Sequence, residues 1–95
     1  MPRPIDQRVS DHVGAVVAET REKRGLSRAE LARGMGISEV AMHHYEKGNR
    51  RITVDNLFAL ASLLGKPVSH FYKGLEIEGP AALTPAPRAK VKTSA

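Results

Sequence analysis

Residues 26–48 read LSRAELARGMGISEVAMHHYEKG, and this segment contains the start and stop signals of two short helices. Ser27 and Glu30 have the spacing of a capping box, in which the serine hydroxyl accepts a hydrogen bond from the Glu30 amide and the carboxylate accepts one from the Ser27 amide. A glycine ends this helix, Ser38 caps the next one, and Gly48 terminates that. Two short helices joined by a tight, glycine-containing turn are typical of a helix-turn-helix.

Three more helices are expected around this pair. The first begins at a cap formed by Ser10 or Asp11 and ends before Gly25. A fourth helix is capped by Thr53, and a short fifth helix spans residues 68–72. The sequence therefore predicts an all-α domain of five short helices. The apolar side chains expected on the buried side of the fourth helix are Val54, Leu57, Phe58, Leu60, Ala61 and Leu64.

The composition favours a polyanionic partner and argues against several other functions. The 95 residues carry a formal charge of +5, which suits a partner whose phosphates release counterions when they are neutralised. The absence of cysteine excludes disulfides and thiolate zinc sites. We expect no metal, no cofactor and no enzyme activity, because no catalytic triad, paired carboxylates or glycine-rich phosphate loop is apparent. Neither a secretory signal nor a membrane span is visible, which predicts a cytoplasmic protein with no membrane partner.

The run of motifs from Val13 to Tyr72 resembles the lambda-repressor-like, Cro-type helix-turn-helix family. This resemblance implies a homodimeric transcriptional regulator, a repressor, that places its third helix in the major groove of double-stranded DNA at a two-fold operator. It also implies a salt bridge between Arg21 and Glu46 that holds the third helix at its angle. The matching pieces are Arg21, Gly25-Leu26-Ser27, Glu30-Leu31-Ala32, Gly36-Ile37-Ser38, Met42, Tyr45-Glu46-Lys47-Gly48, Leu57, Leu60-Ala61 and Leu64.

Four residues on the outward side of the third helix are candidates for reading bases. Glu39 suits the N4 amine of cytosine, although an acid in a first turn is also stabilised by the helix dipole. Val40 suits a thymine methyl, although a lone surface valine needs no explanation. His43 and His44 share that side and are expected at a base edge or a phosphate. Without cysteines or a second matched pair, the two histidines do not indicate a metal site.

A second group of residues is expected to contact phosphates. Arg28 lies in the first turn of the second helix, where members of the resembled family often carry a glutamine that touches the DNA backbone. An arginine there is expected to bond a phosphate directly. The alternative is that these polar side chains are simply solvated surface. The other candidates are Ser38, Lys47, Asn49, Arg50 and Arg51.

The chain divides into four parts. Residues 1–8 contain two prolines and are expected to form a flexible arm, and residues 9–74 form the Cro-type domain. Residues 75–78 alternate in polarity and indicate a short strand or extended arm in the dimer interface, whereas residues 79–95 are a low-complexity basic tail predicted to be disordered. Apolar residues just beyond the core helices are expected to form the two-fold interface, namely Phe71, Tyr72, Leu75 and Ile77.

A second hypothesis for the function stays open at this point. The same fold can serve as an antitoxin-like module, or another protein-binding module, that also binds DNA. Its distinguishing sign is a tail that becomes ordered on a protein partner, and the stretch from Leu75 to Ala95 is long enough for this.

Overall fold

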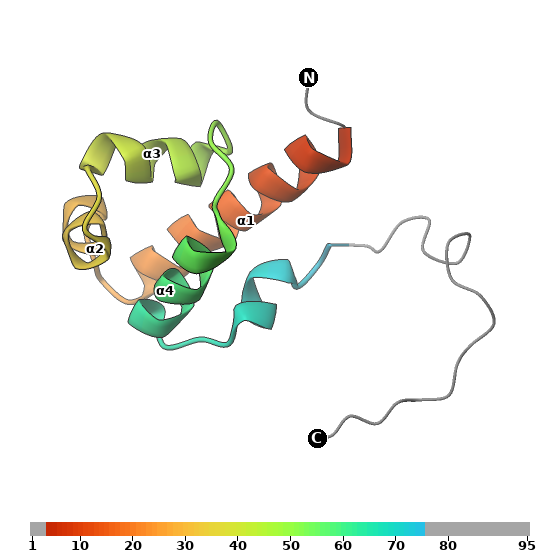
Figure 1. The fold of residues 1–95 in the computed structure, drawn as a ribbon. Helices are drawn as coiled ribbons and strands as arrows, with labels where there is room; N and C mark the ends of the chain where they lie inside the picture. The colour runs from red at the N-terminus through yellow and green to blue at the C-terminus, as the bar shows by residue number, and fades with distance from the viewer. Residues whose placement is uncertain (1–3, 76–95) are drawn as a thin grey trace.

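The computed structural model describes residues 4–75, with side chains from Gln7 onward, and these residues form a helical bundle (Figure 1). The elements are α1 (Pro4–Lys23), α2 (Arg28–Met35), α3 (Glu39–Lys47), α4 (Val54–Leu64) and the 3₁₀ helix η1 (Val68–Tyr72). No strand occurs in residues 4–75, so the all-α prediction is confirmed. None of the described helices is long and apolar enough to span a bilayer. Residues 1–3 and 76–95 lie outside the described part, and so do most of the predicted extension and the tail.

The predicted count of five short helices is not confirmed as a count of α-helices, because residues 4–75 form four α-helices and the last segment is a 3₁₀ helix. Only five residues are available between Pro67 and the turn at Lys73 and Gly74. The segment opens with a hydrogen bond from the His70 amide to the Pro67 carbonyl, 2.9 Å long, which is the i to i+3 pattern of this tighter helix. So short a run has no room to settle into the i to i+4 pattern of a longer helix.

The start of α1 also differs from the prediction, because the helix begins at Pro4 and not at Ser10 or Asp11. Proline lacks an amide hydrogen and has a fixed φ near −65°, which suits the first turn of a helix. Gln7 supports the added turns, since its Nε2 donates to Asp11 Oδ1 at 2.7 Å and to the Gly48 carbonyl at 3.0 Å. The expected irregular arm is therefore wrong for residues 4–8.

The expected caps of the later helices are all present. Ser27 Oγ accepts from the Glu30 amide at 3.0 Å, and Glu30 Oε1 accepts from the Ser27 amide at 2.7 Å. Ser38 and Thr53 each accept from the amide three residues on. Gly36 closes α2 at a φ of 74°, a conformation that costs glycine nothing. These caps set the ends of α2 and α3 and so the geometry of the turn between them.

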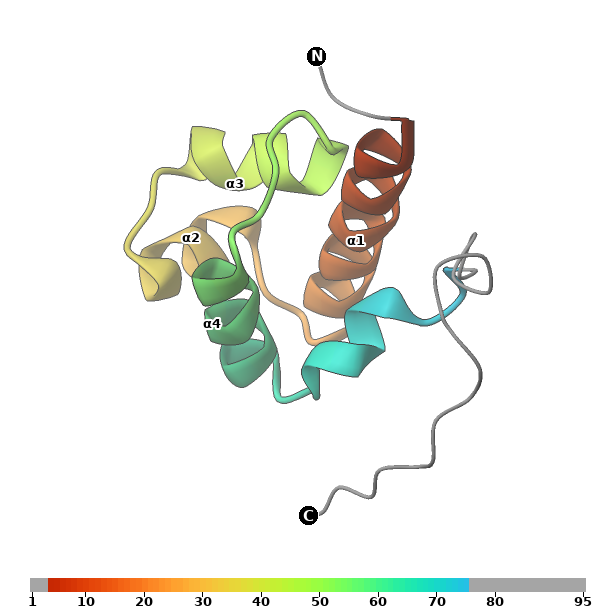
Figure 2. The same ribbon diagram turned by 45° about the vertical axis from the view of Figure 1, so that its right-hand side comes forward.

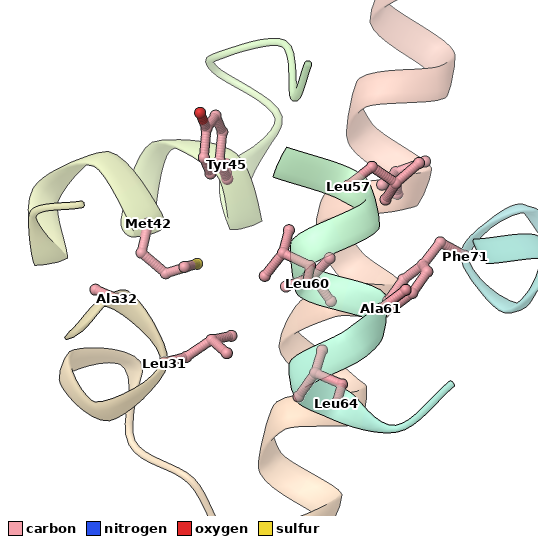
Figure 3. Packing of buried hydrophobic residues seen from close by; sticks show 11 residues of the cluster. Leu31, Ala32, Met42, Tyr45, Leu57, Leu60, Ala61, Leu64 and Phe71 are labelled. Atoms are coloured by element: carbon pink, nitrogen blue, oxygen red, sulfur yellow. The ribbon is translucent and has the colours of Figure 1, made fainter. Parts of the chain in front are cut away.

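The core lies between the helix pair α2–α3 and the other elements (Figure 2). Figure 3 shows Leu31 of α2 and Met42 of α3 pointing toward Leu60 of α4. Phe71 of η1 lies against α4 near Ala61 in the same view, and its side chain is fully buried. The 3₁₀ helix thus completes the core that supports α3.

The outer part of α4 corrects the predicted core. Leu57 and Leu60 are buried as expected, but Val54 is 80% exposed and Phe58 is 67% exposed. Each residue turns a helix by about 100°, so Phe58 lies well round the helix from Leu57. Apolar residues of α4 extend beyond the face that the rest of the chain covers, and this leaves Val54, Phe58 and also Leu63 exposed to solvent.

Candidate nucleic-acid interface

Helix α3 has a buried side and an exposed side. Met42, Tyr45 and Glu46 are buried, whereas Glu39 and Val40 are exposed, Val40 to 65%. Because the amide of Ala41 is bonded to the Ser38 hydroxyl at 3.0 Å, the first turn that carries these two residues is capped. These two of the four predicted base-reading residues therefore lie on a defined helix turn that faces solvent.

His43 and His44 lie further along α3 and are half-buried. Their rings meet edge to face, with centroids 5.8 Å apart. The His44 carbonyl also accepts the amide of Asn49 at 2.9 Å, which fixes the start of the loop after α3. Among residues 4–75, no three His, Asp or Glu side chains are placed to hold a metal ion.

The buried side of α3 lies directly on the backbone of α1 at Gly14. A Cβ atom at this position would overlap the carbonyl oxygen of Tyr45 and would come within 2.8 Å of that of Glu46. Sequence reasoning missed this contact. The available signal was a glycine inside a helical pattern, which costs about 1 kcal/mol relative to alanine and therefore indicates a close approach.

The salt bridge implied by the resemblance is present and buried. Arg21 Nε donates to Glu46 Oε2 at 2.7 Å, and Arg21 Nη2 donates to Glu46 Oε1 at 3.3 Å. Arg21 Nη1 bonds the Leu26 carbonyl at 2.8 Å. The hydrogen bond to Glu46 raises the pKa of Arg21 above its ordinary value. This arginine thereby fastens α1 to α3 and to the start of the turn before α2.

Arg28, a predicted phosphate contact, has a partner that the sequence analysis did not foresee. Its Nε donates to Glu46 Oε1 at 3.1 Å, and its side chain is 33% exposed. Glu46 therefore accepts hydrogen bonds from two arginines, one from α1 and one from α2. No local motif signals this pairing, because 18 residues separate the two side chains in sequence.

The remaining predicted phosphate contacts lie at the two ends of α3. The Ser38 hydroxyl accepts the cap hydrogen bond at the N-terminal end. At the other end, four polar side chains are all exposed. The four are Lys47, Asn49, Arg50 and Arg51. Arg28 belongs to α2 but is bonded to Glu46, which lies in the C-terminal half of α3.

The four residues predicted for the dimer interface differ in their burial. Phe71 is fully buried within the chain, so its assignment to an interface is wrong. Its ring fills the core between η1 and α4, which sequence periodicity did not reveal in so short a segment. Tyr72 is 42% exposed, Leu75 is half-buried, and Ile77 lies outside the described residues.

Comparison with known proteins relates this chain to helix-turn-helix regulators. A profile of the helix-turn-helix family HTH_3 matches residues 17–71. The chain is 32% identical over 72 residues to an uncharacterized HTH-type transcriptional regulator of Rickettsia conorii, covering 76% of this chain and 58% of that protein. It is 35% identical over 68 residues to an uncharacterized transcriptional regulator in the ATPase CF(0) region of Rhodospirillum rubrum, covering 72% and 63%. The chain thus spans about three fifths of the length of these relatives.

Solved structures share the helical arrangement. The restriction-modification controller protein C.AhdI from Aeromonas hydrophila aligns with a TM-score of 0.62 and 26% identity, over 64% of this chain and 92% of that one. The DNA-binding domain of BldD aligns with a TM-score of 0.62 and 28% identity, over 68% of this chain and 94% of that one. Both alignments span nearly the whole of the solved chain, so the likeness extends over the complete domain.

Proposed function

The chain belongs to the HTH_3 helix-turn-helix family of DNA-binding transcription regulators, and we propose from this premise that it is a sequence-specific repressor. In this proposal a homodimer acts in the cytoplasm and binds a two-fold site in double-stranded DNA. Each copy inserts α3 into the major groove, with its N-terminal turn leading. The observation that carries the proposal is the two-sided α3, which is fixed on one side and exposed on the other.

Base recognition is assigned to the exposed side of α3. The Glu39 carboxylate is suited to accept a hydrogen bond from a cytosine amine, and the Val40 side chain is suited to pack on a thymine methyl. His43 and His44 are half-buried, and we assign them to contacts with a base edge or a phosphate. The cap at Ser38 and the backbone contact at Gly14 support this role, because a base-reading helix needs a fixed position.

Phosphate binding is assigned to the polar side chains at the two ends of α3 and to Arg28 of α2. Each phosphate that is neutralised releases counterions, so these contacts set affinity and salt dependence but carry no sequence information. Arg28 belongs to this group, and its exposed fraction leaves part of the guanidinium accessible. The others are Ser38, Lys47, Asn49, Arg50 and Arg51.

For the homodimer, we assign the interface to exposed apolar residues of α4 and η1. Val54, Phe58 and Tyr72 are each more than 40% exposed, although all three are large and apolar or aromatic. A domain of this size buries a limited core, so covering such side chains in a two-fold interface would add stability. Light scattering measures the oligomeric state of the wild type and of the Phe58→Glu variant. We expect the wild type to be a dimer and the Phe58→Glu variant to be a monomer. A Phe58→Glu protein that stays dimeric would contradict the assignment of the interface to this surface.

Selection from a randomised duplex pool tests the proposed recognition. Fluorescence anisotropy then compares the selected duplex with a scrambled one at several salt concentrations. We expect a palindromic winner that binds at least about 1,000-fold more tightly than the scramble. A pool without a winner, or binding that disappears at moderate salt for every sequence, would contradict sequence-specific binding. Repression is tested by placing the selected site over a promoter and measuring transcription with and without the protein.

A further inference from the structure

The two arginines that share Glu46 use their donors in different ways. Arg21 donates hydrogen bonds from Nε and Nη2 to Glu46 and from Nη1 to the Leu26 carbonyl. Arg28 donates one hydrogen bond, from Nε to Glu46 Oε1. Within residues 4–75, the two terminal nitrogens of Arg28 make no hydrogen bond to the protein. Each of the three guanidinium nitrogens of Arg21 therefore makes a hydrogen bond within the fold, whereas Arg28 is held at one nitrogen and keeps its terminal donors for another group.

The charges around Glu46 point to the nature of that other group. One carboxylate, with a side chain only 3% exposed, faces two guanidinium groups. Arg21 has a second carboxylate partner, Glu22 Oε2 at 3.6 Å, whereas Arg28 shares Glu46 with Arg21 and has no other ion-pair partner within residues 4–75. A guanidinium presents its terminal nitrogens in a planar fork that matches two oxygens of a phosphate. A phosphate of the DNA backbone would supply a negative charge of its own for Arg28 and the acceptors for its terminal nitrogens.

We propose that Glu46 is a positioning residue for DNA binding, which holds the Arg28 guanidinium through Nε so that its terminal nitrogens clamp a backbone phosphate. This inference rests on the proposed function. Anchoring the arginine before DNA arrives reduces the side-chain freedom that binding would otherwise remove. An acidic residue of the recognition helix would in this way strengthen the binding of a polyanion.

The sign of one substitution separates this role from simple electrostatics. Glu46→Gln removes a negative charge, and charge alone predicts tighter binding to DNA. The positioning role predicts weaker binding, by roughly five-fold, within the range of couplings measured between residues in contact. Circular dichroism establishes that the variant is folded at the temperature of the titration. Affinity that rises or stays unchanged in the folded Glu46→Gln protein would overturn the inference.

A double-mutant cycle separates positioning from a purely structural effect through Arg21. Kd for the selected duplex is measured for the wild type, Glu46→Gln, Arg28→Ala and the double variant of the full chain. We expect Glu46→Gln to lose its roughly five-fold effect when Arg28 is already alanine, because the two side chains act as one unit. The exposed Arg33, also in α2, gives the matched control, and in an Arg33→Ala background the five-fold effect should persist. Equal losses in all three backgrounds would mean that Glu46 acts only on the position of α3.

Arg28→Lys tests the same idea without disturbing the pair of Arg21 and Glu46. Lysine keeps the charge, but its single ammonium lacks the fork that can bond Glu46 and a phosphate at once. We expect an affinity close to that of Arg28→Ala, and wild-type affinity would overturn the inference.

A measurement without DNA tests the anchoring itself. ¹⁵N relaxation should show a rigid Arg28 Nε–H and a mobile Arg33 Nε–H in the wild type, with both mobile in Glu46→Gln. A mobile Arg28 Nε–H in the wild type would overturn this inference but would leave the proposed function intact. If the wild type binds no duplex selectively, the proposed function fails as well.

Discussion

The two sides of the helix pair α2–α3 differ in how they are held. The inner side, defined here by Leu31, Met42, Glu46 and the backbone against Gly14, is fixed by buried packing, an ion pair and direct backbone contact. On the outer side, Glu30, Glu39, Val40 and Lys47 are exposed. The inner side thus determines where α3 lies, and the outer side determines what α3 can contact. Substitutions on the two sides should therefore separate stability from recognition.

The largest effect is expected at the buried ion pair. Arg21→Met removes the donors that hold Glu46 to α1 and should lower the free energy of unfolding by about 3 kcal/mol. The value is at the low end of the range for broken buried pairs, because Arg28 still neutralises part of the Glu46 charge. Urea denaturation measures it. The matched control is Arg28→Met, and this change should cost clearly less because the Arg28 side chain is one-third exposed. Equal costs for the two variants would show that burial does not distinguish them.

The close backbone contact of α1 and α3 should give the next largest effect. Gly14→Ala places a Cβ against the carbonyl oxygens of Tyr45 and Glu46 and should destabilise the protein by about 2 kcal/mol. Gly34→Ala is the control, because its Cβ would lie 3.4 Å from a Leu63 methyl, an ordinary contact. That change should stabilise the protein by up to about 1 kcal/mol, through better helix propensity. Thermal unfolding of the two variants measures both changes in stability. If Gly14→Ala and Gly34→Ala changed the stability in the same direction, the close contact assigned to Gly14 would be contradicted.

The outer side is tested at Val40. Val40→Ala should leave the free energy of unfolding within about 0.5 kcal/mol of the wild type, because the side chain is exposed. Binding to the selected duplex should weaken by about 1 kcal/mol, the scale of a lost apolar contact, and only at one base pair. Anisotropy with duplexes changed one pair at a time measures this. A uniform loss across all duplexes would indicate that Val40 supports the fold or the backbone contacts and does not read a base.

The sequence was sufficient for features that depend on neighbouring residues. The caps at Ser27, Ser38 and Thr53 need only a side chain and an amide three residues on, and all three are present. The outward position of Glu39 and Val40 follows from helical periodicity in the same way. Local spacing therefore predicted both ends of α3 and its exposed side.

The features that sequence did not predict depend on distant segments. Periodicity shows that α4 has an apolar stripe but does not show how much of it the other helices cover, so Phe58 was wrongly assigned to the core. The bond between Arg28 and Glu46 requires the relative position of α2 and α3. The early start of α1 is supported by Gln7, which bonds the end of α3 some 41 residues away.

The smallest effect is expected at the exposed cap of α2, where it depends on pH. The hydrogen bond from the Ser27 amide holds the pKa of Glu30 below its ordinary value of 4.5. A pKa that is lower in the folded state means that the ionised carboxylate stabilises the fold above the unfolded pKa, and that this stabilisation is lost as pH falls through the folded pKa. The glutamine of Glu30→Gln still accepts the hydrogen bond but carries no charge.

The Tm of wild type and Glu30→Gln should therefore differ slightly at neutral pH and converge in acid below the folded pKa of Glu30. Calorimetry over this pH range measures the difference, and an NMR titration of the carboxyl group gives the folded pKa directly. A difference in Tm that stays constant with pH would mean that hydrogen-bond geometry, and not charge, accounts for the capping effect. The contrast with Arg21 would then rest on burial alone, because the charge at the exposed cap would contribute nothing to stability.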